Sequence, residues 1–341
     1  MTEKEYRLTK QVKIYGWSCK LGANQLDELL EKTGLGGLIE DAAILPVPNS
    51  DMFQVKSIDI FTPLVDEPEL MGEIAACNVT NDIFAMNVPE VSGMLVFLAI
   101  NKNTPMNIAE GILRGINRFM EQKINSKVVG GHTIYSEWPL IGGEASGFVN
   151  KNNLIRKHGV KKGDKLILTK PIGLQPIMAA YRLQKDFPDM LDEYSSNELN
   201  NSIELAKNLM TTSNQGVVKT IYSYDDFSFI HAMTDVTGFG LSGHLKEMLQ
   251  KSRLSAIIET VPSIKFSKNL SEELGYAFDD CLCSETAGGM LLAIDPSKVE
   301  DFSNALSSNG ISNWTVGTID NKEDELVRIS DKVKQIEITK I

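Results

Sequence analysis

Hydrophobic and polar positions in the first half of the chain follow two periods, one typical of strands and one typical of helices. Four short β-type runs lie between about residues 35 and 149, and they read MFQVKSIDIF, SGMLVFLAI, SKVVGGHTI and GEASGFV. Two stretches with helical spacing, near residues 69–86 and 107–122, lie among them. Because the order of strands and helices does not repeat a β-α-β unit, we predict an α+β fold made of two α/β domains.

A polar run, NKNNLIRKHGVKKGDKLILTK, leads into a new strand pattern and predicts a domain boundary near Asn150. We expect a flexible, glycine-containing N-terminal segment (1–34), an N-terminal domain (35–150) and a C-terminal α/β domain (151–341). In the second half, the elements predicted by the pattern are helices near residues 174–183 and 196–210, a helix that ends near Gln250, the strand-like SAIIE, the glycine pair at 288–289 and a final strand.

Composition is that of a large enzyme with a sizeable core. The chain has 341 residues, 42% of them hydrophobic, which is enough for two domains. A net charge of −11 argues against broad binding to nucleic acid or to anionic membranes. The apolar run GMLVFLAI is too short to span a bilayer, and the charged start MTEKEYRLTK has no apolar signal core. We therefore expect a cytoplasmic protein. Its four cysteines make neither a disulfide framework nor a zinc site.

The segment MTDVTGFGLSGH is the most informative in the chain. It places Asp235 before three glycines within six residues, Gly238, Gly240 and Gly243, and the helix-like LKEML follows. Such a segment lets backbone N–H groups approach an anion while the carboxylate holds a metal. It is typical of a site for a nucleotide phosphate and its magnesium ion. A glycine-rich turn between a strand and a helix is the alternative interpretation.

The same glycines also match the dinucleotide fingerprint G-x-G-x-x-G, and Glu259 follows at the end of SAIIE. In that fingerprint the pyrophosphate meets bare N–H groups at the start of a helix. Here Asp235 would repel a pyrophosphate unless a cation lay between them. The metal-bridged interpretation is therefore preferred, provided that other carboxylates share the ion.

Candidate carboxylates lie in the first third of the chain. GLIEDAAILPVP carries Glu40 and Asp41, and the strand-like FQVKSIDIFTP carries Asp59. In the apolar helical stretch ELMGEIAACNVTNDIFAM, Asn78 and Asp82 lie one turn apart on one face. A carboxylate in such a stripe is costly unless it is paired or bound to a metal, although a satisfied hydrogen bond or a buried cap is the alternative. Magnesium favours single carboxylates combined with substrate phosphates.

Ordered motifs along nearly the whole chain resemble those of the selenophosphate synthetase family, within the group that includes aminoimidazole ribonucleotide synthetase and thiamine-phosphate kinase. The motifs are YGWSCK, EDAA, SIDIFTPLVDEP, AACNVTNDIFAMN, VVGGHTI, MTDVTGFGLSGHL and ETAGGMLLAI. The resemblance implies an aminoimidazole ribonucleotide synthetase-like fold, with ATP and Mg²⁺ bound between a dimer-forming N-terminal domain and the C-terminal domain. It also implies the conversion of ATP, selenide and water to selenophosphate, AMP and phosphate in a homodimer.

The resemblance also implies roles for individual residues. Lys20 corresponds to the essential lysine that neutralises transferring phosphoryl groups. Among the histidines, His132 is either part of the site or a structural turn residue, and His158, His231 and His244 are interpreted as surface or core residues. The remaining positions carried over are Asp41, Asp82 and Asp235 as magnesium ligands, Asp59 and Asn78 near the nucleotide, and Gly131, His132 and Thr133 on a phosphate-approaching loop that serves the partner subunit.

The chain departs from the family where selenium is handled. The family's cysteine or selenocysteine, three residues before the essential lysine, is Trp17 here, whose indole is no nucleophile. Cys19 is the remaining candidate thiol. Two other changes are Cys283, in place of an aspartate, and the turn Leu38-Ile39-Glu40-Asp41.

Three functions remain open on the sequence. The first is a selenophosphate synthetase that supplies the selenium donor for selenocysteine or selenouridine. The second is an ATP-using relative whose acceptor is not selenide. The third is a nucleotide-binding regulatory homologue that has lost selenium chemistry.

Overall fold

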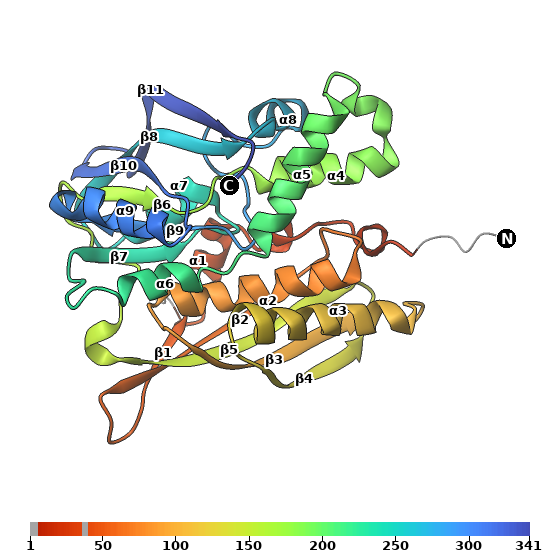
Figure 1. Cartoon of the computed structure of the whole chain (residues 1–341), viewed down its shortest axis with the longest axis horizontal. Helices are drawn as coiled ribbons and strands as arrows, with labels where there is room; N and C mark the ends of the chain where they lie inside the picture. Colours follow the sequence, from red (N-terminus) through yellow and green to blue (C-terminus); the bar gives the residue numbers. More distant parts are fainter. Residues whose placement is uncertain (1–5, 36–39) are drawn as a thin grey trace.

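Two α/β halves, each built on one sheet, pack against each other in the computed structural model, which describes residues 6–35 and 40–341 (Figure 1). The central helix α2 (Pro68–Ala85) lies on the first sheet and also contacts strand β7 (Ile230–Asp235) of the second. The predicted α+β class with two α/β halves is confirmed. The domain boundaries stay predictions. Within the described residues, no helix is both long and apolar enough to cross a bilayer.

The first sheet has the strand order β1-β2-β5-β3-β4. All its pairs are antiparallel except β3 with β4, which is parallel. The four β-type runs predicted from the sequence are β2, β3, β4 and β5. The strands are β1 (Ala43–Pro46), β2 (Met52–Phe61), β3 (Val91–Ile100), β4 (Val128–Tyr135) and β5 (Leu140–Asn150).

Helices α2 and α3 cover one face of this sheet (Figure 1). Pro68 at the first helical position starts α2, and thirteen of its 18 residues are buried, as predicted for a helix that is apolar on nearly every side. Helix α3 (Met106–Arg118) buries only the stripe that contains Ile108, Ile112 and Ile116, and it continues as a π-helical turn, η3 (Phe119–Lys123). Because α2 lies between the two halves, its polar residues can reach both.

The opposite face of the first sheet exposes large apolar side chains. Strand pairing puts Ile58, Leu95 and Phe148 on this face, and they are 66%, 45% and 42% exposed. Side chains on directly paired positions of neighbouring strands share a face. The edge strand β4 adds exposed Ile134, which pairs with Ala99 on this face. A face of this kind marks an interaction surface rather than a surface adapted to water.

The second sheet has the strand order β11-β8-β10-β6-β9-β7 and is antiparallel except for β11 with β8. Helices α4, α5 and α7 fall where the sequence predicted helices, whereas α6, α8 and α9 were missed. The remaining elements are η4 (Lys151–Asn153), β6 (Lys165–Leu168), α4 (Leu174–Asp186), η5 (Pro188–Leu191), α5 (Ser196–Met210), α6 (Gln215–Ile221), α7 (Gly240–Leu249), β8 (Leu254–Ile264), α8 (Ser267–Leu274), β9 (Met290–Ile294), η6 (Pro296–Lys298), α9 (Val299–Ser308), β10 (Trp314–Asn321) and β11 (Val327–Ile338).

The segment before β1 contains two 3-10 turns, η1 (Leu8–Gln11) and η2 (Trp17–Cys19), and helix α1 (Ala23–Lys32). Leu8 and Trp17 are 0% and 7% exposed, so both belong to the core. The expectation that residues 1–34 are flexible stays a prediction, and residues 1–5 lie outside the described residues.

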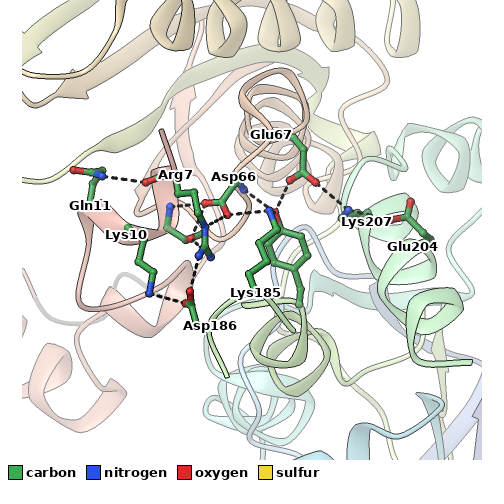
Figure 2. Close-up of polar contacts among 11 residues, drawn as sticks. Arg7, Lys10, Gln11, Asp66, Glu67, Lys185, Asp186, Glu204 and Lys207 are labelled. Carbon is green, nitrogen blue, oxygen red and sulfur yellow. Dashed lines mark hydrogen bonds and ion pairs between the residues drawn. The ribbon is translucent and has the colours of Figure 1, made fainter. Parts of the chain in front are cut away.

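An ion network ties the N-terminal segment to both halves (Figure 2). Arg7 Nε lies 2.7 Å from Asp66 Oδ2 at the end of the first half's β2–α2 connection, and Arg7 also pairs with Asp186 at the end of α4. Lys10 joins Asp186 at 2.8 Å, and Lys185 joins Asp66 at 3.1 Å. The network fixes the start of the segment that leads to Trp17 and Lys20.

Candidate active site between the two halves

A cavity of about 550 Å³ lies where α2 and β7 bring the two halves together. Four aspartates from both halves line it. Asp41 precedes β1, Asp59 is on β2, Asp82 is on α2, and Asp235 is the last residue of β7. Three lysines, Lys20, Lys157 and Lys251, line it as well. The sequence therefore predicted a set of acids that the fold brings into one cavity.

Asp41, Asp82 and Asp235 form a cluster with the geometry of a metal site. One carboxylate oxygen from each lies within 4.8 Å of the other two. Both oxygens of Asp235 and one of Asp41 are buried without a hydrogen-bond partner in the described part of the chain. Burial raises the pKa of Asp235 well above its ordinary value, and the Asp82 and Asp41 carboxylates raise it further. These hard oxygen donors fit Mg²⁺, because a divalent cation would satisfy the unpartnered oxygens and offset their repulsion.

The fourth aspartate is held by a chain of hydrogen bonds that starts at Trp17. The indole Nε1–H of Trp17 donates to Asn78 Oδ1 at 2.9 Å, and Asn78 Nδ2 donates to Asp59 Oδ2 at 2.8 Å. The predicted spacing of Asn78 and Asp82 on one face of a helix is confirmed, and Ser57 donates to Asp82. Burial raises the pKa of Asp59 well above its ordinary value, and the neighbouring Asp82 adds to the rise. Asp59 thus lies beside the metal cluster without being one of its three members.

Lys20 enters the cavity from the N-terminal segment. Its Nζ lies 4.4 Å from the ring centroid of Phe239 and 5.2 Å from that of Trp17, and it forms no ion pair with any described residue. The glycine-rich turn approaches it closely: a Cβ at Gly238 would lie 3.1 Å from Lys20 Cδ. Aromatic faces hold an ammonium in place while leaving its N–H groups available to an anion. Lys20 therefore lies in the same cavity as the aspartates, where its ammonium can contact a phosphate group.

The turn after Asp235 has a backbone that requires glycine, as the sequence predicted. Helix α7 begins at Gly240, whose φ of +68° and close approach to the carbonyls of Cys281 and Cys283 exclude a side chain. Glu259, which the dinucleotide interpretation requires near a ribose, lies on β8 and accepts a hydrogen bond from Thr318 instead. It does not line the cavity. The geometry favours the metal-bridged interpretation of these glycines.

Sequence reasoning missed Lys157 and Glu247. Lys157 is 4% exposed, pairs with Asp41 across the two halves, and lies 2.9 Å from Glu247 Oε2. Burial alone would raise the pKa of Glu247, but His244 and Lys157 lower it to about 2. His244 lines the cavity but is a buried core residue that contacts Thr237 Oγ1 at 3.2 Å, as expected. Lys157 lies in a lysine-rich run that resembled a solvated junction, so no local signal identified it.

Residues 131–133 and Cys19, which the sequence placed in the site, lie outside this cavity. Gly131, His132 and Thr133 belong to strand β4, so the expectation that they form a loop is wrong: parallel pairing with β3 extends through them. They are exposed on the edge of the first sheet and do not line this cavity.

The cysteines are also outside the cavity. Cys19 is partly buried on η2 and does not line it. Burial raises the pKa of Cys281 and of Cys283 to about 12, which makes both thiols inert. Leu38 and Ile39 of the altered turn lie outside the described residues.

Comparison with known proteins first defines the class. A family model described as AIR synthase related protein, N-terminal domain, matches residues 39–149, and one described as AIR synthase related protein, C-terminal domain, matches residues 161–330. The solved structure of AaThiL complexed with AMPPCP and TMP has the same fold, with a TM-score of 0.69 at 18% identity, over 92% of this chain and 95% of that chain. The fold is that of an AIR synthase-like protein with two α/β domains.

Sequence relatives identify the family within this class. A selenide, water dikinase from Methanocaldococcus jannaschii is 35% identical, over 98% of this chain and 99% of its own length. A selenide, water dikinase from Methanococcus maripaludis is 37% identical, over 96% of this chain and 100% of its own length. The chain belongs to the selenide, water dikinase family, which is also called the selenophosphate synthetase family.

Proposed function

We propose that this protein is an ATP-dependent selenophosphate synthetase, which converts ATP, selenide and water to selenophosphate, AMP and phosphate. The observation that carries the proposal is the cluster of Asp41, Asp82 and Asp235 in one cavity with Lys20, in a chain of the selenide, water dikinase family. The Lys20 ammonium has no ion-pair partner among the described residues. Its product would supply selenium for selenocysteine or selenouridine.

Three aspartates, Asp41, Asp82 and Asp235, would hold Mg²⁺ in this site. The ion supplies charge neutralisation for the polyphosphate, as metal ions do in phosphoryl transfer. Asp59, held in place by the hydrogen bond from Asn78, would lie beside the bound ion and the nucleotide. Lys20 balances the charge that develops on the transferring phosphoryl group. Lys157 holds Asp41 in place, because its ammonium bonds both Asp41 and Glu247. Burial raises the pKa of Asp41, and the Lys157 ammonium partly opposes that rise.

A second candidate function follows from Trp17. In place of the family's cysteine or selenocysteine, the chain has a buried indole that donates a hydrogen bond and stacks on Phe61 at 5.4 Å. Because residue 17 is buried and bonded as part of the core, it favours one of two other functions. One is an ATP-cleaving relative that does not use selenide, and the other is a nucleotide-binding regulatory homologue. In the synthetase, Cys19 would provide the remaining thiol next to Lys20, or selenide would react without one.

We further propose that the protein acts as a homodimer in the cytoplasm, without nucleic-acid or membrane partners. The apolar outer face of the first sheet, with Ile58, Leu95 and Phe148, supports self-association. His132 pairs with Phe97 beside this face, which supports the expectation that β4 serves the site of the partner subunit. The four unpaired cysteines, all in the described part of the chain, fit a reducing compartment.

Phosphorus NMR of the protein with ATP and magnesium, with and without selenide, tests the proposal. A synthetase yields selenophosphate, AMP and phosphate only when selenide is present. The selenide-independent relative yields phosphate and ADP or AMP in both samples, and the regulatory homologue leaves ATP intact in both. The Cys19→Ser protein in the same assay determines whether that thiol handles selenium: its selenophosphate signal disappears if Cys19 reacts and persists if it does not.

A further inference from the structure

A second cavity, of about 170 Å³, lies on the other side of the segment that carries Trp17 and Lys20. Trp17 and Ser18 line this second cavity, whereas Lys20 lines the carboxylate cavity, so the short turn η2 forms the partition between the two. The opposite wall comes from α4, through Gln175 and Arg182, and from the connection between α8 and β9, through Tyr276 and Ser284.

Arg182 is the unusual member of this lining. Its guanidinium Cζ lies 4.0 Å from the ring centroid of Tyr15, and no hydrogen bond or ion pair joins it to any described residue. The nearest acids along α4 and the β2–α2 connection are already engaged, because Asp186 pairs with Arg7 and Lys10, and Asp66 with Arg7 and Lys185 (Figure 2). A partly buried guanidinium without a carboxylate partner is costly unless it receives an anion.

The rest of the lining suits an anion as well. The cavity carries two cations, Arg182 and Lys13, and no acid, in a protein whose net charge is −11. Gln175 is fixed at the back of the cavity, since its amide donates to Ser18 Oγ at 3.0 Å and accepts from the N–H of Ser284 at 3.0 Å. The phenol of Tyr276 lies within electrostatic range of Arg182. This cavity therefore differs in charge from its acidic neighbour.

We propose that this cavity binds a small inorganic anion on Arg182, next to Trp17, and that the anion is the acceptor of the phosphoryl group. The volume is more than ten times the roughly 10–15 Å³ that one water molecule needs, which leaves room for an anion of a few heavy atoms but not for a nucleotide. The assignment to the acceptor rests on the proposed function, under which the acceptor is hydrogen selenide. The anion site itself does not depend on it.

The position of this second cavity, beside the carboxylate cavity, is consistent with the binding of an anion. An anion held by Arg182 is kept apart from the four aspartates, which would repel it. The cavity therefore retains the acceptor before transfer, and the acceptor must move past the η2 turn to reach the phosphorus of the nucleotide beside Lys20. The guanidinium of Arg182 would retain the anion by charge, so that no thiol at position 17 is needed to hold it.

Titration calorimetry of the full-length protein, under anaerobic conditions with excess chelator and no ATP, tests the proposal. The chelator removes metal that would attract anions to the aspartates, and the probes are hydrogen selenide and orthophosphate. We expect saturable binding of hydrogen selenide to the wild-type protein. Arg182→Gln should weaken it by about tenfold to a hundredfold, as expected when a charged hydrogen-bond donor is lost. Arg182→Lys, which keeps the charge, should retain most of the affinity.

Lys185→Gln is the matched control, because it removes a cation from the same helix at a residue that does not line the cavity. It should bind hydrogen selenide like the wild-type protein. Equal affinity in the wild-type and Arg182→Gln proteins, or an equal loss in Lys185→Gln, would overturn the anion site. Binding of orthophosphate alone would overturn the assignment to the acceptor. Because binding is measured without turnover, these results are independent of whether selenophosphate forms.

Discussion

The indole of Trp17 donates its N–H to Asn78 Oδ1 at 2.9 Å, and this bond links residue 17 to the carboxylates of the candidate metal site. Asn78 Oδ1 also accepts the N–H of Ala287 at 2.8 Å, while its amide donates to Asp59. Residue 17 is therefore part of the scaffold that orients a site carboxylate. Its replacement therefore changes the packing around the site.

Replacement of Trp17 is expected to destabilise the protein in proportion to the volume removed. Trp17→Phe keeps the stacking on Phe61 and loses one hydrogen bond, and since Asn78 Oδ1 retains Ala287, the cost should be about 1 kcal/mol. Trp17→Cys leaves a cavity and should cost about 3 kcal/mol or more. Denaturant unfolding of the three proteins measures the difference. A fully stable Trp17→Cys protein would contradict the buried role of the indole.

Metal binding by the aspartate cluster predicts a shared phenotype for two substitutions. Asp82→Asn and Asp235→Asn should each weaken Mg-ATP binding and lower turnover by roughly a hundredfold or more, because each removes a ligand of a charge-neutralising ion. Nucleotide titrations with and without magnesium, together with steady-state kinetics, measure both effects. The matched control is Asp51→Asn, since the Asp51 side chain is 92% exposed in the β1–β2 turn. Tight ATP binding in excess chelator would refute the assignment.

The place of Lys20 predicts a separation of binding from catalysis. Lys20→Ala should abolish ATP cleavage but retain much of the affinity for Mg-ATP, because the ammonium acts chiefly on charge that develops in the transition state. Lys32→Ala, at an exposed position on α1, should leave both unchanged. Equilibrium nucleotide binding and single-turnover cleavage distinguish the two effects. If Lys20→Ala loses affinity and rate equally, Lys20 acts in ground-state binding instead.

Local patterns in the sequence predicted the elements whose periodicity is strong. The apolar stripe of α2 predicted both its burial and the shared face of Asn78 and Asp82, because helical geometry alone brings residues four apart together. Helices α6 and α8 were missed because they have only seven and eight residues, too few to show a clear period. Helix α9, with ten residues, was also missed although it is as long as α7. The chain therefore carries enough local information for the first sheet and for much of the second half.

Contacts between distant segments were not predictable in the same way. Lys157 and Asp41 come from different halves, and neither local composition nor spacing links them. Arg182 belongs to an ordinary helical stretch, and only the tertiary fold places its guanidinium in a cavity without acids. Resemblance to a family identified the aspartates, since their motifs are shared. It gave no sign of residues outside those motifs.

The exposed outer face of the first sheet predicts that one charge disrupts assembly. Leu95→Glu should convert the expected dimer to a monomer, because it replaces an exposed apolar side chain with a second carboxylate directly opposite Glu144 on this face. Met106→Glu is the control: Met106 is 63% exposed but lies on α3, on the covered side of the sheet. Sedimentation velocity at micromolar concentration measures the change. A wild-type protein that is fully active as a monomer would contradict the prediction.

Glu285 predicts a pH dependence of stability that does not involve the metal site. It is 2% exposed, and its two carboxylate oxygens accept the N–H groups of Gly173 and Leu174 at the start of α4, at 2.7 and 2.9 Å. Burial raises the pKa of Glu285 to about 8 despite these bonds. A carboxyl group whose pKa is higher in the folded than in the unfolded protein stabilises the fold at low pH. That contribution is lost as the pH rises towards the folded-state pKa.

The stability of the wild-type protein should therefore fall between about pH 5 and about pH 8, by an amount on the order of a few kcal/mol from this group alone. Glu285→Gln has no proton to lose, so its melting temperature should decline less over the same range. Glu272→Gln, at an exposed position on α8, should follow the wild-type curve, because it changes a carboxyl group without burial. Melting curves of the three proteins at several pH values measure these slopes. Parallel curves for the wild-type and Glu285→Gln proteins would mean that Glu285 is ionised throughout, held as a carboxylate by the two N–H groups and the dipole of α4.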